Sequence, residues 1–233
     1  MTGHAFFIPY SVNSGKFNMD FDEKLLNIAV SEKKETPTLR LYGWSPACVS
    51  LGRNQDDSHI NKDFCNENNI DIVRRLTGGR ALLHDNELTY SFVCPVNFLK
   101  NGETIIHSYK EISGALATGL KKAGIAAYMP EEKKASTKFE YCMSLSTGAD
   151  LSFKGKKIAG SAQFRKQGYI LQHGSIMFDY DKEKIKNIFG EAPLEDKITT
   201  IKESAPQVSL EGLSNSLKAG FEEYFDLYFK PFS

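Results

Sequence analysis

The chain has 233 residues, of which 29 are basic and 29 acidic, so its formal net charge at pH 7 is +0. This balance excludes the broad positive field of a non-specific nucleic-acid binder, and a hydrophobic share of 41% excludes a largely disordered chain. No apolar stretch is long enough to span a membrane, and no basic and apolar leader opens the sequence. We therefore expect a cytoplasmic protein, monomeric by default, with no nucleic-acid or membrane partner.

The first third of the sequence predicts helices and strands in mixed order. A helix is predicted over residues 18–30, with Asn18 as its N-cap. Strands are predicted over residues 38–44, 48–51 and 70–76, with a helix over 59–68 between the last two.

Two strand patterns follow directly, over residues 80–84 and 87–95. Asp85 and Asn86 separate them and favour a tight turn. The sequence therefore predicts a β-hairpin at this point.

The second half predicts two long helices and four strands. The helices cover residues 105–123, ended by Gly124, and 210–225; the strands cover 125–129, 151–153, 157–163 and 169–178, with a turn at Lys154 and Gly155. Because strands and helices do not alternate regularly, we predict an α+β fold with a mixed, mostly antiparallel sheet flanked by helices. No linker divides the chain, so residues 1–233 are predicted as a single domain with a core from about 33 to 220.

A glycine pair stands in the segment from Arg74 to His84. Gly78 and Gly79 let the backbone approach a ligand closely, although a plain glycine turn explains them equally well. The segment matches neither the phosphate-binding P-loop nor the dinucleotide-binding pattern. His84 lies at the end of the strand pattern, where a lone histidine is more often structural than catalytic.

The segment from Lys154 to Asp179 carries a second group of candidates. Gly160, Ser161 and Ala162 are small residues that leave a strand open to a ligand, and Gly174, beside His173, indicates a bulge or a close approach of two backbones. Lys157 opens the first strand of this segment; on composition alone it is interpreted as a solvated surface lysine.

Cys142 lies in a basic stretch. Residues 133–166 contain eight Lys or Arg and two Asp or Glu, a local net charge of +6. A nearby ammonium group lowers the pKa of a thiol and prepares it as a nucleophile, whereas the alternative is a solvated lysine-rich face. Cys48, Cys65 and Cys94 are interpreted as inert apolar residues, and because no C-x-x-C pair occurs we expect no metal site.

Taken together, these segments resemble the catalytic domain shared by lipoate–protein ligases, biotin–protein ligases and octanoyltransferases. The resemblance extends over NMDFDEKLL, TLRLYGWSPACVSLGRNQ, RRLTGGRALLHDNELTYS and GKKIAGSAQFRKQGYILQHGSIMFD. Where lipoate ligases typically have a third glycine and a Gly-Asn pair, this chain has Arg80 and Asn86-Glu87, as cysteine-dependent octanoyltransferases do. Those enzymes carry an acyl-accepting cysteine upstream of a motif lysine, and Cys142 and Lys157 match this pair.

The resemblance implies an acyltransferase of lipoate biosynthesis and protein lipoylation. Cys142 would take octanoyl from octanoyl-acyl carrier protein as a thioester intermediate, and a lysine of a lipoyl domain or of the glycine-cleavage H protein would then accept it. Lys157 would favour the Cys142 thiolate and orient the acyl carbonyl. The octanoyl group and its surroundings would contact Arg75, Thr77, Gly78, Gly79, Arg80, His84, Gly160, Ser161, Ala162, His173 and Gly174.

Three alternatives remain open. A lipoate–protein ligase would use ATP and Mg and would not need Cys142, whereas the transferase needs no cofactor. An amidotransferase would move octanoyl between lipoyl-bearing proteins, and a silent homologue would only bind carrier proteins. In every case the +6 stretch would attract acidic protein partners.

Overall fold

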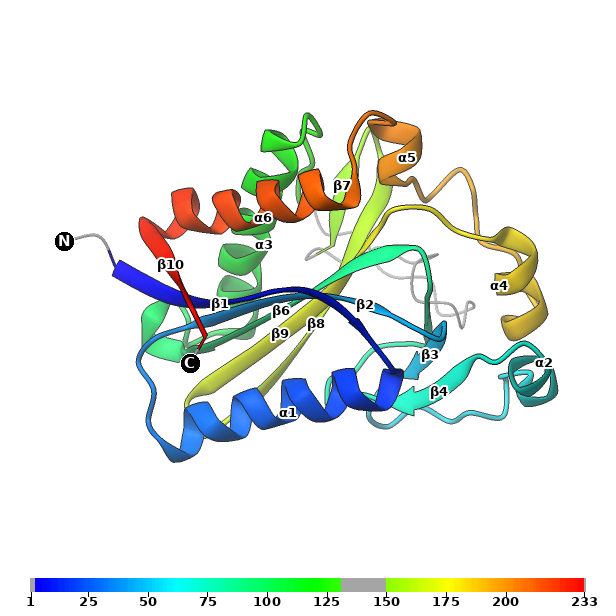
Figure 1. Cartoon of the computed structure of the whole chain (residues 1–233), viewed down its shortest axis with the longest axis horizontal. Helices are drawn as coiled ribbons and strands as arrows, with labels where there is room; N and C mark the ends of the chain where they lie inside the picture. Colours follow the sequence, from blue (N-terminus) through cyan, green and yellow to red (C-terminus); the bar gives the residue numbers. More distant parts are fainter. Residues whose placement is uncertain (1–2, 131–149, 233) are drawn as a thin grey trace.

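Two β-sheets form the framework of the molecule (Figure 1). The computed structural model describes residues 3–130 and 150–232. The large sheet has the strand order β10-β1-β2-β6-β9-β8-β7, and the small sheet has the order β4-β3-β5. The strands are β1 (Gly3–Asn13), β2 (Thr38–Trp44), β3 (Cys48–Leu51), β4 (Asp71–Arg74), β5 (Leu82–His84), β6 (Glu87–Pro95), β7 (Leu151–Phe153), β8 (Lys156–Lys166), β9 (Tyr169–Met177) and β10 (Leu227–Pro231).

The large sheet is mixed. Strand β1 pairs in parallel with β10 and β2, whereas all neighbours from β2 to β7 pair antiparallel. In the small sheet β3 pairs in parallel with β4 and antiparallel with β5. The predicted α+β fold with a mixed, mostly antiparallel sheet is confirmed.

Helices cover both faces of the large sheet. They are α1 (Gly15–Ser31), α2 (Lys62–Glu67), α3 (Ile105–Lys122), α4 (Lys182–Phe189), α5 (Ile201–Ser204) and α6 (Leu210–Phe225), with a 3-10 turn at Val96–Phe98. Figure 1 shows α3 and α6 on one side of this sheet and α1 on the other. In the part of the chain that the structure describes, no helix is long and apolar enough to cross a membrane.

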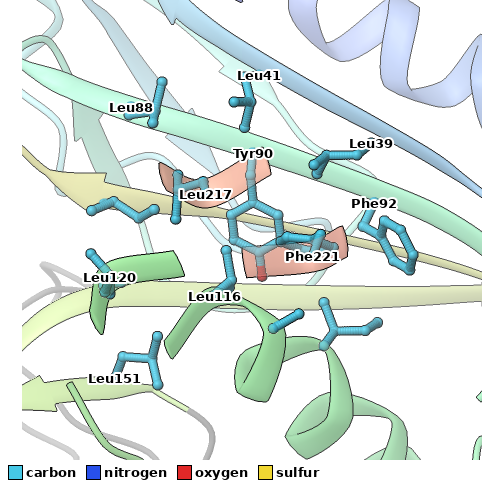
Figure 2. Packing of buried hydrophobic residues seen from close by; sticks show 14 of the residues in the cluster. Leu39, Leu41, Leu88, Tyr90, Phe92, Leu116, Leu120, Leu151, Leu217 and Phe221 are labelled. Carbon is cyan, nitrogen blue, oxygen red and sulfur yellow. The ribbon is translucent and has the colours of Figure 1, made fainter. Parts of the chain in front are cut away.

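Neighbouring residues of the central strands pack against different helices. Phe92 of β6 belongs to the main apolar cluster with Leu116 of α3 and Phe221 of α6, whereas the adjacent Val93 packs with Leu26 of α1. Figure 2 shows the main cluster between the sheet and the two helices. Successive side chains of a strand point to opposite faces of the sheet. Because helices cover both faces, β6 is buried along its whole length.

Several predicted boundaries coincide with those in the structure. The ranges predicted as 38–44, 48–51, 87–95, 151–153 and 210–225 are those of β2, β3, β6, β7 and α6. Lys154 and Gly155 turn from β7 into β8 with φ values of 49° and 80°, and Gly124, with φ 87°, follows the C-cap of α3.

The hairpin predicted across Asp85 and Asn86 is wrong. Strand β5 pairs with β3 of the small sheet, whereas β6 pairs with β2 and β9 of the large sheet. The two residues therefore pass the chain from one sheet to the other, and the carbonyl of Asn86 accepts hydrogen bonds from the backbone N–H groups of Phe178 and Asp179.

The predicted N-cap of the first helix is also wrong. Ser14 caps α1, and its hydroxyl accepts from the backbone N–H of Phe17. Asn18 is buried one turn inside the helix, where its amide donates to the carbonyl of Gly43 at 3.0 Å. The strand predicted over 125–129 is reduced to a bridge between Tyr128 and Ser152.

Strands β1 and β10, at the two ends of the chain, were not predicted, and helix α1 lies before the range 33–220 that was expected as the core. Strands β1 and β10 extend the large sheet, and Leu26 of α1 is fully buried. Helices α4 and α5 were not predicted either; Ile185 and Ile188 of α4 pack beneath the small sheet.

Gly220 provides a test of the contact between α3 and α6. A Cβ at this position would overlap the backbone of Gly119 in α3. We expect Gly220→Ala to lower the free energy of unfolding by about 2–3 kcal/mol, because the helices must separate. Asn215→Ala, at an exposed position of α6, should leave it nearly unchanged in the same urea titration. Equal stability of the two variants would contradict the close packing.

Candidate functional site

A pocket of about 500 Å³, its open mouth included, is lined by residues of both sheets. Met19 of α1, Trp44 of β2 and Leu82 of β5 contribute apolar surface to its wall. Many of the residues predicted to bind substrate also line it: Arg75, Gly79, His84, Gly160, Ser161, Ala162, His173 and Gly174. The sequence-based candidates from two distant segments thus meet at one cavity.

His84 is held at the pocket wall by two polar partners. Its Nδ1 lies 2.7 Å from a carboxylate oxygen of Glu87, and its Nε2 lies 2.7 Å from the hydroxyl of Ser50. The imidazole also stacks on Trp44, with ring centroids 4.0 Å apart. All four side chains are buried, so the ring has a fixed orientation toward the pocket.

Glu87 is surrounded by hydrogen-bond donors. The hydroxyls of Thr89 and Ser175 donate to its two carboxylate oxygens, one to each. Trp44 Nε1 in turn donates to the Thr89 hydroxyl at 2.7 Å. Two hydroxyls and one imidazole nitrogen therefore surround the two oxygens of this side chain.

His173 has a similar arrangement of partners on the neighbouring side of the pocket. Its Nδ1 lies 3.2 Å from Asp22 of α1, and its Nε2 lies 2.8 Å from the hydroxyl of Thr77. Asp22 also pairs with Arg40 at 2.8 Å and accepts from the Tyr42 hydroxyl at 2.9 Å. The two histidines therefore each bridge a carboxylate and a hydroxyl.

The partners of Asp22 determine its charge state. Burial alone would raise the pKa of this carboxyl group, but the hydrogen bonds from His173 and Tyr42 and the positive charge of Arg40 outweigh burial and lower the pKa. Burial raises the pKa of Tyr42 well above its usual value, so the phenol remains a neutral donor. Asp22 and Arg40 thus form a buried ion pair, with side chains 2% and 1% exposed.

Arg75 shapes the glycine loop at the mouth. Its Nη1 donates to the Ser50 carbonyl at 2.8 Å and to the Ser50 hydroxyl at 3.0 Å, and its Nη2 donates to the carbonyls of Gly78 and Arg80. Gly79 has φ 98°, a conformation that favours glycine. The loop backbone also lies so close to β3 that a Cβ on Gly52 would overlap the carbonyl of Gly79.

Strands β8 and β9 meet closely on the opposite wall. A Cβ on Gly174 would overlap the carbonyl oxygen of Gly160. The Ser161 hydroxyl accepts from the Tyr90 phenol at 2.7 Å. The close approach predicted for Gly174 is confirmed, and the register of β9 with β6 and β8 continues through it without a bulge.

Some residues predicted to bind substrate or act in catalysis are not among those that line the pocket. Thr77 holds His173, and Gly78 and Arg80 supply carbonyls to Arg75. Lys157 is buried rather than solvated, and its ammonium pairs with Asp150 at 2.9 Å. Strand β8 places Lys157 three residues before Gly160 of the pocket wall.

The cysteines divide into two groups. Cys48, Cys65 and Cys94 are buried, and burial raises the pKa of each thiol, so they are poor nucleophiles. The predicted nucleophile Cys142 lies outside the described residues. Among residues 3–130 and 150–232, no three side chains of the metal-ligating types gather as a metal site would require.

Sequence reasoning missed Ser50, Glu87 and Asp22. Ser50 interrupts an apolar strand, and Glu87 opens a run of strand-forming residues that is otherwise uncharged. Asp22 lies within a helix, among the residues of its buried face. A polar residue inside an apolar pattern was the available signal, since burial of such a group demands a partner.

Asp22→Asn tests the buried charge network. The variant keeps the side-chain volume but leaves Arg40 buried without a counter-charge, so we expect a loss of about 3–5 kcal/mol in the free energy of unfolding. Asp20→Asn, at an exposed position of the same helix, should cost less than about 1 kcal/mol. Chemical denaturation at pH 7 checks both values.

The stability lost in Asp22→Asn depends on pH with a known sign. Because folding lowers the pKa of Asp22, its stabilising contribution is present above the unfolded pKa of about 4 and is lost as the pH falls through the folded-state pKa. Asp22→Asn should therefore lose less stability than the unmodified chain on acidification below about pH 4. Identical acid profiles would contradict this assignment.

Comparisons with known proteins bear on the family and the fold. The sequence profile of the Lipoyl protein ligase A/B catalytic domain matches residues 14–222. Octanoyltransferase LipM of Lysinibacillus sphaericus is 36% identical, with 96% of this chain and 89% of the relative aligned. Octanoyltransferase LipM of Bacillus subtilis is 35% identical, with 97% and 88% aligned.

Solved structures share the architecture. The structure of lipoate-protein ligase A bound with ATP has a TM-score of 0.80 and 20% identity, over 98% of this chain and 88% of that chain. A bipartite lipoate protein ligase from Thermoplasma acidophilum has a TM-score of 0.78 and 21% identity, over 100% and 87%. At these identities the structural likeness shows the fold. The profile match over residues 14–222 establishes that the chain belongs to the lipoyl protein ligase A/B catalytic domain family.

Proposed function

We propose that this chain is an octanoyltransferase of lipoate biosynthesis. It moves an octanoyl group from acyl carrier protein to a lysine of a lipoyl domain or of the glycine-cleavage H protein. One observation carries the proposal: relatives named Octanoyltransferase LipM align with 96–97% of the chain at 35–36% identity.

The pocket suits a medium-length acyl chain. Trp44, Leu82 and Met19 offer apolar surface, and Gly160 and Gly174 line the pocket without side chains of their own. An octanoyl chain has about seven methylene or methyl groups, each stabilised by roughly 0.8 kcal/mol on burial, so the chain alone supplies several kcal/mol of binding. The nearby polar side chains are bonded to one another, so they do not oppose an apolar ligand.

Cys142 is the proposed acyl acceptor. Its thiolate attacks the carrier thioester, forming a new S–C bond while the carrier's thiol leaves. The uncharged amine of the acceptor lysine then attacks the enzyme thioester, forming the C–N bond of the amide and releasing Cys142. The energy of the thioester drives amide formation, so neither step consumes ATP or needs Mg.

Lys157 is proposed to support this chemistry at short range. Its ammonium favours the Cys142 thiolate over the thiol and orients the acyl carbonyl. The structural support is that Lys157 is 3% exposed, is fixed by Asp150, and lies on the strand that carries Gly160, Ser161 and Ala162 into the pocket wall.

The thioester intermediate can be observed directly. Incubation with octanoyl-acyl carrier protein, without ATP or acceptor, should add one octanoyl group to the chain by intact mass spectrometry, and hydroxylamine should remove it. Cys142→Ser should abolish the hydroxylamine-sensitive adduct, because an ester formed at serine resists this reagent better than a thioester.

Cys65→Ala is the matched control, because Cys65 is a buried thiol outside the pocket wall, and it should retain the adduct. Absence of an adduct, together with ATP-dependent modification from free octanoate, would establish a ligase instead. Acylation by octanoylated H protein but not by the carrier would establish an amidotransferase.

The +6 stretch of residues 133–166 is proposed to attract acidic carrier and acceptor proteins. Replacing Lys133, Lys134 and Lys138 by Glu should lower kcat/KM for octanoyl-acyl carrier protein about tenfold at low ionic strength, with the difference shrinking as salt rises.

A control with the same change in net charge replaces three exposed lysines on separate helices, namely Lys24, Lys110 and Lys186. Its kcat/KM should change much less. If both triple variants behave alike, total charge rather than this stretch governs the encounter.

A further inference from the structure

Ser50, His84 and Glu87 form a hydroxyl, imidazole and carboxylate relay that the transfer chemistry of Cys142 does not use. They come from three strands, β3, β5 and β6. Ser50 Oγ lies 2.7 Å from His84 Nε2, and His84 Nδ1 lies 2.7 Å from Glu87. A nucleophile within reach of a base, with the base oriented by a third group, is the arrangement that activates a serine.

The carboxylate fixes the tautomer of the histidine. When Nδ1 donates its proton to Glu87, Nε2 is left as an acceptor for the Ser50 hydroxyl. Thr89 and Ser175 hold the carboxylate in place, and Trp44 stacks on the imidazole. The base is therefore preorganised in the orientation in which it removes a proton from Ser50.

A positive charge lies beside the same hydroxyl. Arg75 Nη1 is 3.0 Å from Ser50 Oγ and 2.8 Å from the Ser50 carbonyl. A guanidinium at this distance favours loss of the serine proton to the histidine, because it stabilises negative charge on the hydroxyl oxygen. Ser50, His84 and Arg75 all line the pocket, so an acyl group in it meets the relay.

The histidine on the other side of the pocket provides an internal contrast. His173 also bridges a hydroxyl and a carboxylate, but its carboxylate, Asp22, is already neutralised by Arg40. Its hydroxyl partner, Thr77, is not among the residues of the pocket wall. Of these two clusters, only the one at Ser50 combines a carboxylate held by hydroxyl groups rather than by an arginine with a hydroxyl that lines the cavity.

We infer that Ser50 is a second nucleophile in this pocket and gives the protein a hydrolase activity toward medium-chain acyl esters and thioesters. Ser50 Oγ bonds to the acyl carbon as the bond from that carbon to the leaving alcohol or thiol breaks. The Ser50 proton passes to His84 Nε2 and then to the leaving group. Water attacks the acyl serine in the same way, His84 returns a proton to Ser50, and the fatty acid is released.

The test uses the full chain carrying Cys142→Ala, which removes the proposed thioester route. The result for Ser50 then does not depend on whether Cys142 is an acyl acceptor. This protein should hydrolyse p-nitrophenyl octanoate and should be labelled once by a fluorophosphonate, with the label mapped to Ser50 by peptide mass spectrometry. Adding Ser50→Ala should abolish the label and reduce hydrolysis about tenfold or more.

The matched control is Ser91→Ala, which removes another buried serine hydroxyl; it has no hydrogen-bond partner among residues 3–130 and 150–232 and lies outside the pocket wall. It should retain both label and hydrolysis. Mapping the label on protein with Ser50 intact gives a result that does not depend on how the Ser50 variant folds. A label on another residue, no label, or hydrolysis unaffected in a folded Ser50→Ala variant would overturn the inference.

Discussion

Two buried carboxylates, Asp22 and Glu87, constrain the architecture around the pocket. An ionised carboxylate removed from water must be given donors or a positive partner, since burial of an unpaired charge is prohibitively costly. The donors lie on β2, β5, β6 and β9: Arg40, Tyr42, His84, Thr89, His173 and Ser175. Each carboxylate thereby ties strands that are distant in the sequence, and a shift between the two sheets would separate Glu87 from His84. The polar network thus fixes the geometry of a cavity that also contains apolar surface.

Close backbone contacts complete the pocket from the other direction. Gly174 brings β9 against the Gly160 carbonyl, and Gly52 brings β3 against the carbonyl of Gly79. A side chain at either position would force the strands or the loop apart. The absence of Cβ atoms therefore permits these backbones to approach, and the contacts fix the walls of the pocket that Trp44 and Leu82 also line. The cavity thus combines apolar surface from Trp44 and Leu82 with two hydrogen-bonded histidines, His84 and His173.

The sequence predicted local features well where local physics decides them. The strand at residues 38–44 and the helix at 210–225 follow from periodicity, and the turn at Lys154 and Gly155 follows from residue type. Asp85 and Asn86 also favour a turn, but which strands pair is decided by burial of two different faces, which lies beyond any local pattern. For the site, glycine and histidine motifs predicted much of the pocket wall, whereas Ser50, Glu87 and Asp22 became visible only when the fold placed their partners beside them.

The ion pair of Lys157 and Asp150 changes how the lysine acts. At 2.9 Å the two charges form a dipole, whose field falls off faster with distance than that of an isolated ammonium. Because both side chains are 3% exposed, solvent screens the pair little. The effect of this dipole on the pKa of a thiol depends on the side from which the thiol approaches. The net charge of +6 for residues 133–166 already includes both members, which cancel each other. The local excess of positive charge therefore comes from the other basic residues of this stretch, and Lys157 is left to act on groups within its immediate reach.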